Sequence, residues 1–167
     1  TMDTLIANMV GREITNQFPR EKVPRGKKVL EVKHLKSGMQ VKDVSFEAYA
    51  GEVVGFAGLV GAGRTETSRV IFGADEKEGG EIYLNGQKLE LKCPSDAINA
   101  GIVLIPEDRK KDGLCTKLSI RDNIALPNLP LISTGLTGKV NKKKEAEMVN
   151  KGKSSLTIKM SGPEVEA

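Results

Sequence analysis

The chain has 167 residues, a length typical of one domain that buries about 70% of its unfolded surface. Its 26 basic residues are nearly balanced by 22 acidic ones, so the net charge of +4 indicates a solvated surface and no nucleic-acid partner. Cys93 and Cys115 stand far apart with His34 as the one histidine, which excludes a zinc site and predicts reduced thiols. The sequence shows no signal peptide and no apolar run of about 18 residues, so we expect no membrane-spanning helix.

The beginning of the chain is expected to lie outside the main domain. Apolar residues at helical spacing followed by Gly11 predict a short helix over residues 3–10. Residues 12–27 are polar and contain prolines, as is typical of a linker. We therefore expect residues 1–27 to be the tail of an upstream domain plus a linker, and residues 28–167 to form one incomplete domain.

Two strands are predicted next. Apolar and polar residues alternate over residues 28–34, which predicts one strand. Residues 41–49 predict another strand, with Val44 and Phe46 on one face. His34 is expected to be a surface residue.

The segment Gly58–Thr65 matches the phosphate-loop pattern G-x-x-x-x-G-K-S/T except that Arg64 takes the lysine position. Residues 52–57 before it are mostly apolar and predict a buried strand, and residues 65–72 after it predict a helix. Strand, glycine loop and helix are the order in which backbone N–H groups and a helix N-terminus converge on a polyphosphate. Glycines permit positive φ values and close approach to the oxygens.

This loop departs from the standard pattern in two ways. Arg64 keeps the positive charge of lysine but is planar and bulkier, so the exchange is not conservative. Glu66 adds a negative charge that suits the helix dipole and repels a phosphate. A glycine turn that serves packing alone is the alternative interpretation of the same residues.

A hairpin and a short helix follow. Residues 81–84 and 87–91 flank Asn85-Gly86, the strongest short signal for a type I′ turn, which would place Ile82 opposite Leu89. Pro94 is expected to open a helix over residues 95–100 that Gly101 closes.

Residues 102–105 form an unbroken branched run, the pattern of a strand buried on both faces of a parallel sheet. The charged residues 106–114 follow at its C-terminal end, where open α/β sheets hold their ligands. We interpret them as a loop that contacts metal, water or a neighbouring subunit; a solvated turn is the alternative.

The last part of the chain predicts two helices. Ser119 begins a capping-box-like helix that Pro127 ends. Residues 128–140 are expected to be a loop, and residues 141–153 a lysine-rich helix with Ala146 and Val149 on its apolar stripe.

Two of these stretches together resemble a known family. The runs GLVGAGRTE (residues 58–66) and IPEDRKKDGL (residues 105–114) are similar to the second nucleotide-binding domain of bacterial ABC-type sugar importers. These are the fused ATPase subunits of the ribose, xylose and galactose class, and the resemblance covers most of residues 28–165.

The resemblance implies an α/β P-loop NTPase of the ABC ATPase type, present in part, with a RecA-like core and an antiparallel β subdomain. It implies ATP and Mg²⁺ as ligands. Glu107 falls at the position of the Q-loop glutamine and is a metal-ligand candidate together with Thr65. No aromatic residue is present in residues 34–41 to stack on adenine. The residues carried over to the nucleotide are Gly58, Gly61, Ala62, Gly63, Arg64, Thr65 and Glu66.

The implied partners are the first nucleotide-binding domain of the same subunit, or a second copy, and the membrane permease subunits. The implied location is cytoplasmic, at the inner face of the membrane. The family's LSGGQ-like signature, Walker B aspartate, catalytic glutamate and switch histidine would lie beyond Ala167, so we expect this chain alone to be inactive. The competing hypothesis is a nucleotide-independent docking module with a vestigial phosphate loop.

Overall fold

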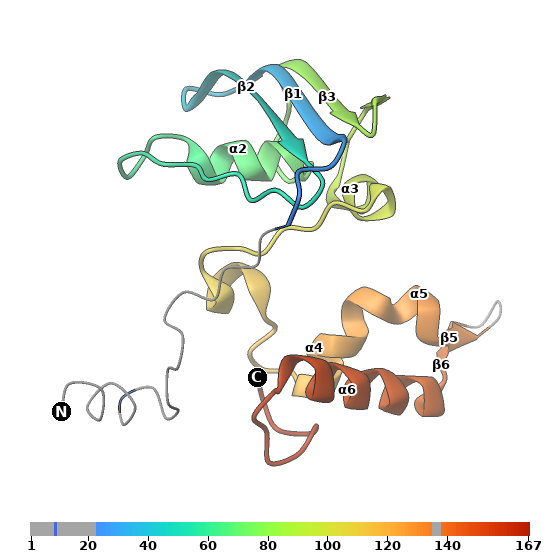
Figure 1. The fold of residues 1–167 in the computed structure, drawn as a ribbon. Helices are drawn as coiled ribbons and strands as arrows, with labels where there is room; N and C mark the ends of the chain where they lie inside the picture. The colour runs from blue at the N-terminus through green and yellow to red at the C-terminus, as the bar shows by residue number, and fades with distance from the viewer. Residues whose placement is uncertain (1–8, 10–22, 135–137) are drawn as a thin grey trace. The chain divides into compact units, whose positions relative to one another are not determined.

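The computed structural model describes Met9, residues 23–134 and residues 138–167, and these form two compact units that divide after Val103 (Figure 1). The helix predicted over residues 3–10 lies outside the described residues apart from Met9. Residues 12–22 of the predicted linker lie outside them too. The domain boundary predicted before Lys28 stays a prediction.

The first unit is built on a four-stranded antiparallel sheet in the order β2-β1-β3-β4. The predicted strands at residues 28–34 and 41–49 are confirmed, and the first of them is longer than predicted. The strands are β1 (Lys28–Ser37), β2 (Val41–Tyr49), β3 (Gly79–Leu84) and β4 (Gln87–Leu89).

The hairpin between β3 and β4 forms as predicted. Ile82 pairs with Leu89 across the two strands. Asn85 and Gly86 have φ values of 51° and 82°, the positive values that a type I′ turn requires at both central positions. The local turn chemistry therefore fixes this register.

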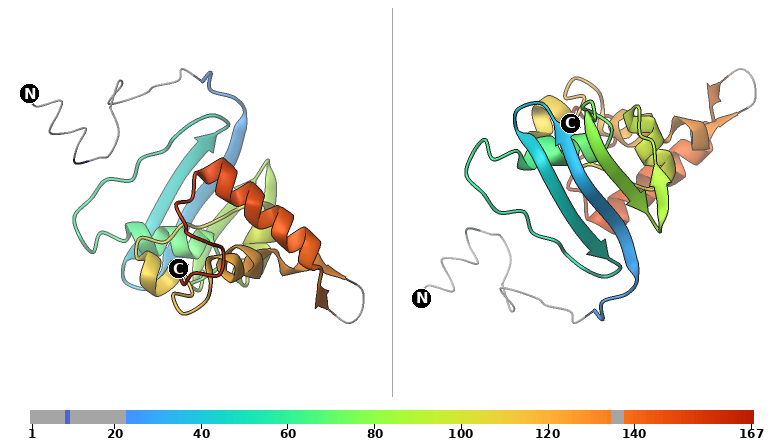
Figure 2. Two further views of the ribbon diagram at one scale, coloured as in Figure 1. Left: turned by 90° about the horizontal axis from the view of Figure 1, so that it is seen from below. Right: turned by 90° about the horizontal axis from the view of Figure 1, so that it is seen from above.

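The helix α2 (Arg64–Ile71) covers one face of this sheet and is seen behind it in the right-hand view of Figure 2. Apolar side chains from the sheet and the helix meet there in an aliphatic core without tryptophan, as the composition predicts. Gly73 follows the helix with a φ of 73°, the left-handed conformation that commonly ends a helix. The fully or nearly buried members of the core are Val32, Leu35, Val41, Val70, Ile71 and Ile82.

His34 forms a bulge in β1. Its φ is 50°, and the pairing of β1 with β2 shifts between Val32 and Leu35. The side chain is exposed, as predicted, and its Nδ1 lies 2.9 Å from Asp43 Oδ1 on β2. The sequence pattern did not indicate this acidic partner.

The two strands predicted for a parallel sheet are absent from the described residues. Residues 52–57 have no regular structure, and Val53 is 96% exposed. Residues 102–105 are also irregular, with Val103 76% and Ile105 87% exposed. Their apolar composition predicted burial, but a strand needs hydrogen-bonding neighbours, and no described strand pairs with either segment. Both expectations are wrong for this structure.

The helix α3 (Pro94–Ala100) ends the regular structure of the first unit. Pro94 occupies its first turn and Gly101 follows it with a φ of 91°, so the predicted helix and its stop are confirmed. The side chain of Asp96 accepts hydrogen bonds from the N–H groups of Lys92 and Cys93 at 2.9 and 3.2 Å, which caps the helix.

The second unit is mainly helical. Ser119 caps α4 by accepting from the Asp122 N–H at 3.0 Å, as predicted. Residues 128–140 were predicted to be a loop and instead hold a short helix and a two-stranded ribbon. The elements are η1 (Arg109–Gly113, a π-helical turn), α4 (Ile120–Ala125), η2 (Leu126–Asn128), α5 (Leu129–Ile132), β5 (Ser133–Thr134), β6 (Lys139–Val140) and α6 (Lys142–Leu156).

The helix α6 confirms the predicted lysine-rich helix but presents a different face from the one predicted. Val149 is 3% exposed, whereas Ala146 is exposed. Glu145 is buried beside Val149, and its carboxylate accepts from the Lys142 ammonium at 2.9 Å. Arg121 Nε of α4 also lies 4.0 Å from Glu145 Oε1, so the buried carboxylate has charged partners on both helices.

Candidate phosphate-binding site

The loop that matches the phosphate pattern connects residues 52–57 to α2 and projects from the sheet unit (Figure 1). Gly61 and Gly63 have φ values of +81° and +80°, a conformation that L side chains rarely adopt. Within the loop, the Ala62 N–H donates to the Leu59 carbonyl at 3.1 Å. The two glycines of the phosphate-loop pattern are therefore the residues at which the chain turns into the helix.

Gly63 is fixed by the sheet behind it. A Cβ on Gly63 would lie 2.6 Å from the Gln40 carbonyl oxygen, in the turn between β1 and β2. Gly61 has the same backbone conformation, but a Cβ there would meet nothing within 4 Å. The loop is thus backed by protein backbone at Gly63 and faces open space at Gly61.

The N-terminus of α2 points its first N–H groups into this loop. Gly63 is the N-cap residue and supplies no side-chain cap. Its carbonyl oxygen accepts from the N–H and the hydroxyl of Thr67, at 2.9 and 2.6 Å, which anchors the first turn. An anion at an uncapped helix N-terminus gains from both the N–H groups and the helix dipole.

The charged and hydroxyl groups of the pattern lie in the first turn of α2. Arg64 and Thr65 are exposed to solvent, and Glu66 is half-buried. A guanidinium and a hydroxyl at this place can bind phosphate oxygens and a phosphate-bound cation, respectively. The residues that are present therefore fit a phosphate group, with Glu66 opposing it electrostatically.

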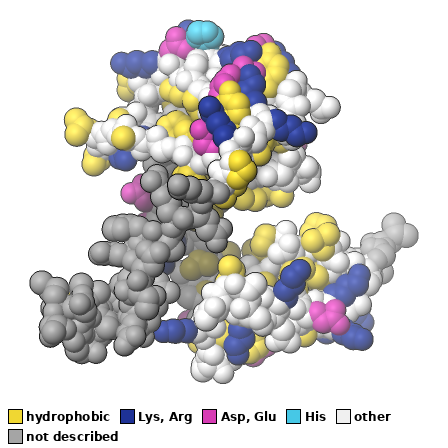
Figure 3. All heavy atoms as spheres, viewed as in Figure 1, with side chains coloured by type: hydrophobic (Ala, Val, Ile, Leu, Met, Phe, Trp, Pro, Cys, Tyr) yellow, Lys and Arg dark blue, Asp and Glu magenta, His cyan; other side chains and the backbone are white. Residues whose placement is uncertain are grey.

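The segment that leads into the loop makes an aromatic contact near its end. The Phe56 ring meets the Phe46 ring of β2 edge to face, with centroids 4.9 Å apart. Leu59 and Val60, after it, are 86% and 98% exposed. Figure 3 shows hydrophobic side chains at the left of the sheet unit, over the loop that precedes α2.

Glu107 lies in the other unit, in the exposed stretch before η1. The next residue, Asp108, caps that turn by accepting from the N–H groups of Lys110 and Lys111 at 3.0 and 3.1 Å. The shared role of Thr65 and Glu107 at one metal ion stays a prediction. The described residues contain no cluster of three or more His, Cys, Asp or Glu side chains able to hold a metal without a ligand's help.

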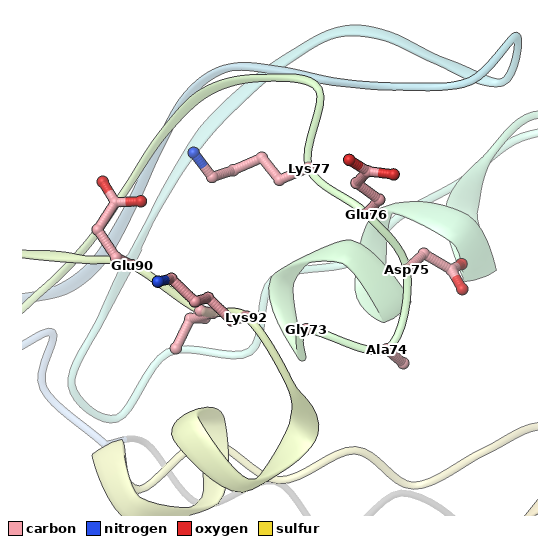
Figure 4. Close-up of a pocket in the computed structure, with 8 residues that line it drawn as sticks. Gly73, Ala74, Asp75, Glu76, Lys77, Glu90 and Lys92 are labelled. Carbon is pink, nitrogen blue, oxygen red and sulfur yellow. The ribbon is translucent and has the colours of Figure 1, made fainter.

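A pocket of about 510 Å³ lies at the opposite end of α2 from the loop (Figure 4). Gly73 and the turn after it form one side, and the chain after β4 forms the other. Lys77 and Lys92 share the lining with Asp75, Glu76 and Glu90. Carboxylates outnumber ammonium groups there, so the pocket is unsuited to a polyphosphate, and it is not the candidate site.

Sequence reasoning missed the contribution of the β1–β2 turn. The contact of Gln40 with Gly63 joins residues distant in sequence, and no local pattern signals it. Met39, beside Gln40, is 89% exposed. Residues 34–41 contain no aromatic residue that could stack on a base, and Met39 is the large apolar side chain in the turn.

Comparison with known proteins identifies the family. A family model described as ABC transporter matches residues 41–162, and the chain belongs to that family. Membership makes the fold that of a P-loop NTPase and implies a nucleotide-binding module. Among the described residues, no helix is long and apolar enough to cross a membrane.

Individual relatives show which ABC transporter proteins the chain is similar to. The chain is 44% identical over 165 residues to the ribose import ATP-binding protein RbsA of Bacillus subtilis, covering 99% of this chain and 33% of that protein. It is 50% identical over 141 residues to the xylose import ATP-binding protein XylG of Thermoanaerobacter pseudethanolicus, covering 80% of this chain and 28% of that protein. The chain therefore spans about a third of the length of the curated relatives it matches.

Proposed function

We propose that this chain is the ATP-binding portion of the energy-coupling subunit of a monosaccharide ABC importer, with a degenerate Walker A loop. One observation carries the proposal: a glycine loop with two left-handed glycines leads into a helix whose N-cap is glycine, beside an exposed arginine. The relatives support the direction of transport and the class of cargo, because those named above are import ATP-binding proteins for ribose and xylose.

In this proposal the backbone of Gly58, Gly61, Ala62 and Gly63 surrounds the terminal phosphates. Arg64 supplies the positive charge that lysine supplies in the standard pattern. Its planar fork suits two phosphate oxygens at once, at the cost of the compact fit that an ammonium has.

Two residues are proposed for the cation. Thr65 is proposed for its hydroxyl oxygen and Glu107 for its carboxylate oxygens, the ligand type that Mg²⁺ prefers. Bound Mg²⁺ supplies charge neutralisation between the phosphate oxygens. Glu66, in the first turn, opposes the phosphate charge, and we therefore expect weak, magnesium-dependent binding.

The proposed partners are a nucleotide-binding domain, from the same subunit or a second copy, and the membrane permease subunits of the importer. The proposed location is the cytoplasmic face of the membrane. The names of the relatives support these assignments, since an import ATP-binding protein acts with a membrane pathway.

The test is an NMR titration of the ¹⁵N-labelled chain with MgATP. We expect the amide signals of Gly61, Gly63 and Arg64 to move in a saturable way. Gly86, at the tip of the β3–β4 hairpin and away from the loop, is the internal control. If the loop signals stay fixed at millimolar MgATP while the spectrum shows a folded protein, the docking-module hypothesis replaces this one.

A further inference from the structure

The described end of the predicted linker, residues 23–27, is fastened to the turn that follows β2. The Gly26 N–H donates to the Ala50 carbonyl at 2.8 Å, and the Ala50 N–H donates to the Lys27 carbonyl at 3.0 Å. Ala50 therefore bonds to two successive residues just before β1 begins at Lys28. We call residues 23–27 the latch, because hydrogen bonds of Gly26 and Lys27 attach this part of the predicted linker to Ala50.

One side chain of the latch joins the ends of that turn. The Arg25 guanidinium carbon lies 3.6 Å from the centroid of the Tyr49 ring. Arg25 Nη2 also lies 3.4 Å from Glu52 Oε1. The other oxygen of the Glu52 carboxylate accepts from the Tyr49 N–H at 2.9 Å. Arg25, Tyr49 and Glu52 therefore form one connected cluster, in which arginine meets the aromatic face and the carboxylate at once.

At two positions of this contact a side chain could be added only by displacing a side chain on the other segment. Gly51 has a φ of +76°, and a Cβ there would lie 2.6 Å from Val23 Cγ1. A Cβ on Gly26 would lie 2.9 Å from the Ala50 Cβ. Glycine thus stands on both sides of the contact, at the points where the latch and the turn touch.

The turn under the latch is where the chain leaves the sheet for the phosphate loop. Figure 2 shows the chain between β2 and α2 running back along the β2 side of the sheet. Glu52 is its first residue, and its N–H donates to the Tyr49 carbonyl at 3.0 Å. Phe56 contacts β2 further along. Residues 52–57 belong to no strand, and they are attached to the sheet unit at Glu52 and at Phe56.

We propose that the latch positions the phosphate loop: docked through Arg25 on Tyr49 and Glu52, it fixes the start of the incoming segment and so favours the nucleotide-binding arrangement. Arg25 is a positioning residue, since it acts on the loop through Glu52. The inference rests on the proposed function of the loop for its effect on affinity. Its effect on the conformation of the loop does not depend on nucleotide.

The experiment uses the 167-residue chain with Arg25→Ala, and Lys27→Ala as the matched control. Lys27 is an exposed cation of the latch whose backbone oxygen holds Ala50, and alanine retains that oxygen. Arg25→Lys is the conservative variant, which keeps the charge beside Glu52 and loses the planar stacking on Tyr49. Amide exchange at Gly26 and Ala50 measures docking of the latch without nucleotide.

For Arg25→Ala we expect about fivefold faster exchange at Gly26 and Ala50, from the loss of one exposed stacking contact and one ion pair. We expect the NMR signals of Gly61 and Gly63 to shift without nucleotide, and the MgATP affinity to fall by a similar factor. Arg25→Lys should be intermediate. Lys27→Ala should match the wild type in all three measurements.

The outcomes separate this inference from the proposed function. If exchange rises at Ala50 while the Gly61 and Gly63 signals stay fixed, the latch does not position the loop and the inference is overturned. If exchange does not rise, or Lys27→Ala has the same effect as Arg25→Ala, the Arg25 cluster is not the attachment, which also overturns it. If the loop signals shift but no variant, wild type included, binds MgATP, the inference holds and the proposed function fails.

Discussion

The carbonyl oxygen of Gln40 lies where a side chain on Gly63 would have to stand, 2.6 Å from the position of its Cβ. The turn between β1 and β2 therefore backs the N-cap of α2. Because Gly63 also has a φ of +80°, two independent constraints select glycine at this position. The shape of the loop is a property of the sheet unit and not of the loop residues alone.

Substitution of Gly63 by alanine should destabilise the chain more than the same substitution at Gly61. At both positions the new alanine must adopt the left-handed backbone conformation, which costs about 1–2 kcal/mol. Gly63→Ala must also displace the Gln40 backbone, which adds about 1–3 kcal/mol, whereas Gly61 has open space around its Cβ position. Thermal unfolding of both variants checks this expectation. Equal melting temperatures would show that the Gln40 contact does not persist in solution.

Local chemistry predicted most of the sheet unit. Asn85-Gly86 predicted both a hairpin and its register, and Gly101 predicted the end of α3. These signals come from residue types that favour particular φ values and from neighbours within a few residues, and both can be seen in the sequence. The aliphatic character of the core followed from the composition, which has 4% aromatic residues and no tryptophan.

The remaining features depend on partners distant in sequence. The apolar run at residues 102–105 predicted a buried strand, but a strand also needs neighbours on its edges, which no local pattern supplies. The backing of Gly63 by Gln40 and the stacking of Arg25 on Tyr49 are likewise tertiary contacts. In the candidate site, the loop residues were predictable, and the residues that hold the loop in place were not.

The ion pair at the end of α2 should make stability depend on pH in the acid range. Arg69 Nε and Nη2 donate to the two Asp75 oxygens at 2.8 and 2.7 Å, and this pairing lowers the pKa of Asp75. A lowered pKa in the folded state gives stability that is present above the unfolded pKa, about 4, and lost as pH falls through the folded value.

Near neutral pH, the free energy of unfolding of Asp75→Asn should therefore be about 0.5–1 kcal/mol lower than that of the wild type. On acidification below about pH 4, the free energy of unfolding of this variant should fall less than that of the wild type. Urea unfolding across pH 3–7 measures both effects. Glu76→Gln removes a carboxylate from the same turn, and its side chain has no ion-pair partner among the described residues, so it should resemble the wild type. A pH dependence of Asp75→Asn identical to that of the wild type would contradict this assignment.

The exposed apolar segments should make the isolated chain associate with itself. Val53, Val103 and Ile105 are each at least 76% exposed and lie in segments of strand-like composition. Unpaired apolar segments invite pairing with another chain. Sedimentation velocity at low micromolar concentration should show dimers or larger species. Val103→Lys with Ile105→Lys should shift the distribution toward monomer, and a wild-type monomer at all concentrations would contradict the expectation.

Nucleotide binding should tolerate a change of base. The phosphate contacts come from the loop, whereas the β1–β2 turn offers the flexible Met39 side chain and no aromatic ring. A thioether chain adapts to any base and selects none strongly. The dissociation constants of MgATP and MgGTP should therefore agree within about threefold, a difference of less than 1 kcal/mol. A tenfold preference for ATP would reveal a base-reading pocket elsewhere.

The central claim is that the Gly58–Thr65 loop binds the phosphates of a nucleotide. Isothermal titration of MgATP into the wild-type chain and into an Arg64→Ala, Thr65→Ala double variant tests it most directly. Loss of a charged hydrogen-bonding partner should weaken binding at least about tenfold, and chelation of magnesium should weaken the wild type further. Saturable binding in the wild type that falls in the double variant is the predicted result. Equal affinity in both proteins, or no binding to a folded wild type, would contradict it.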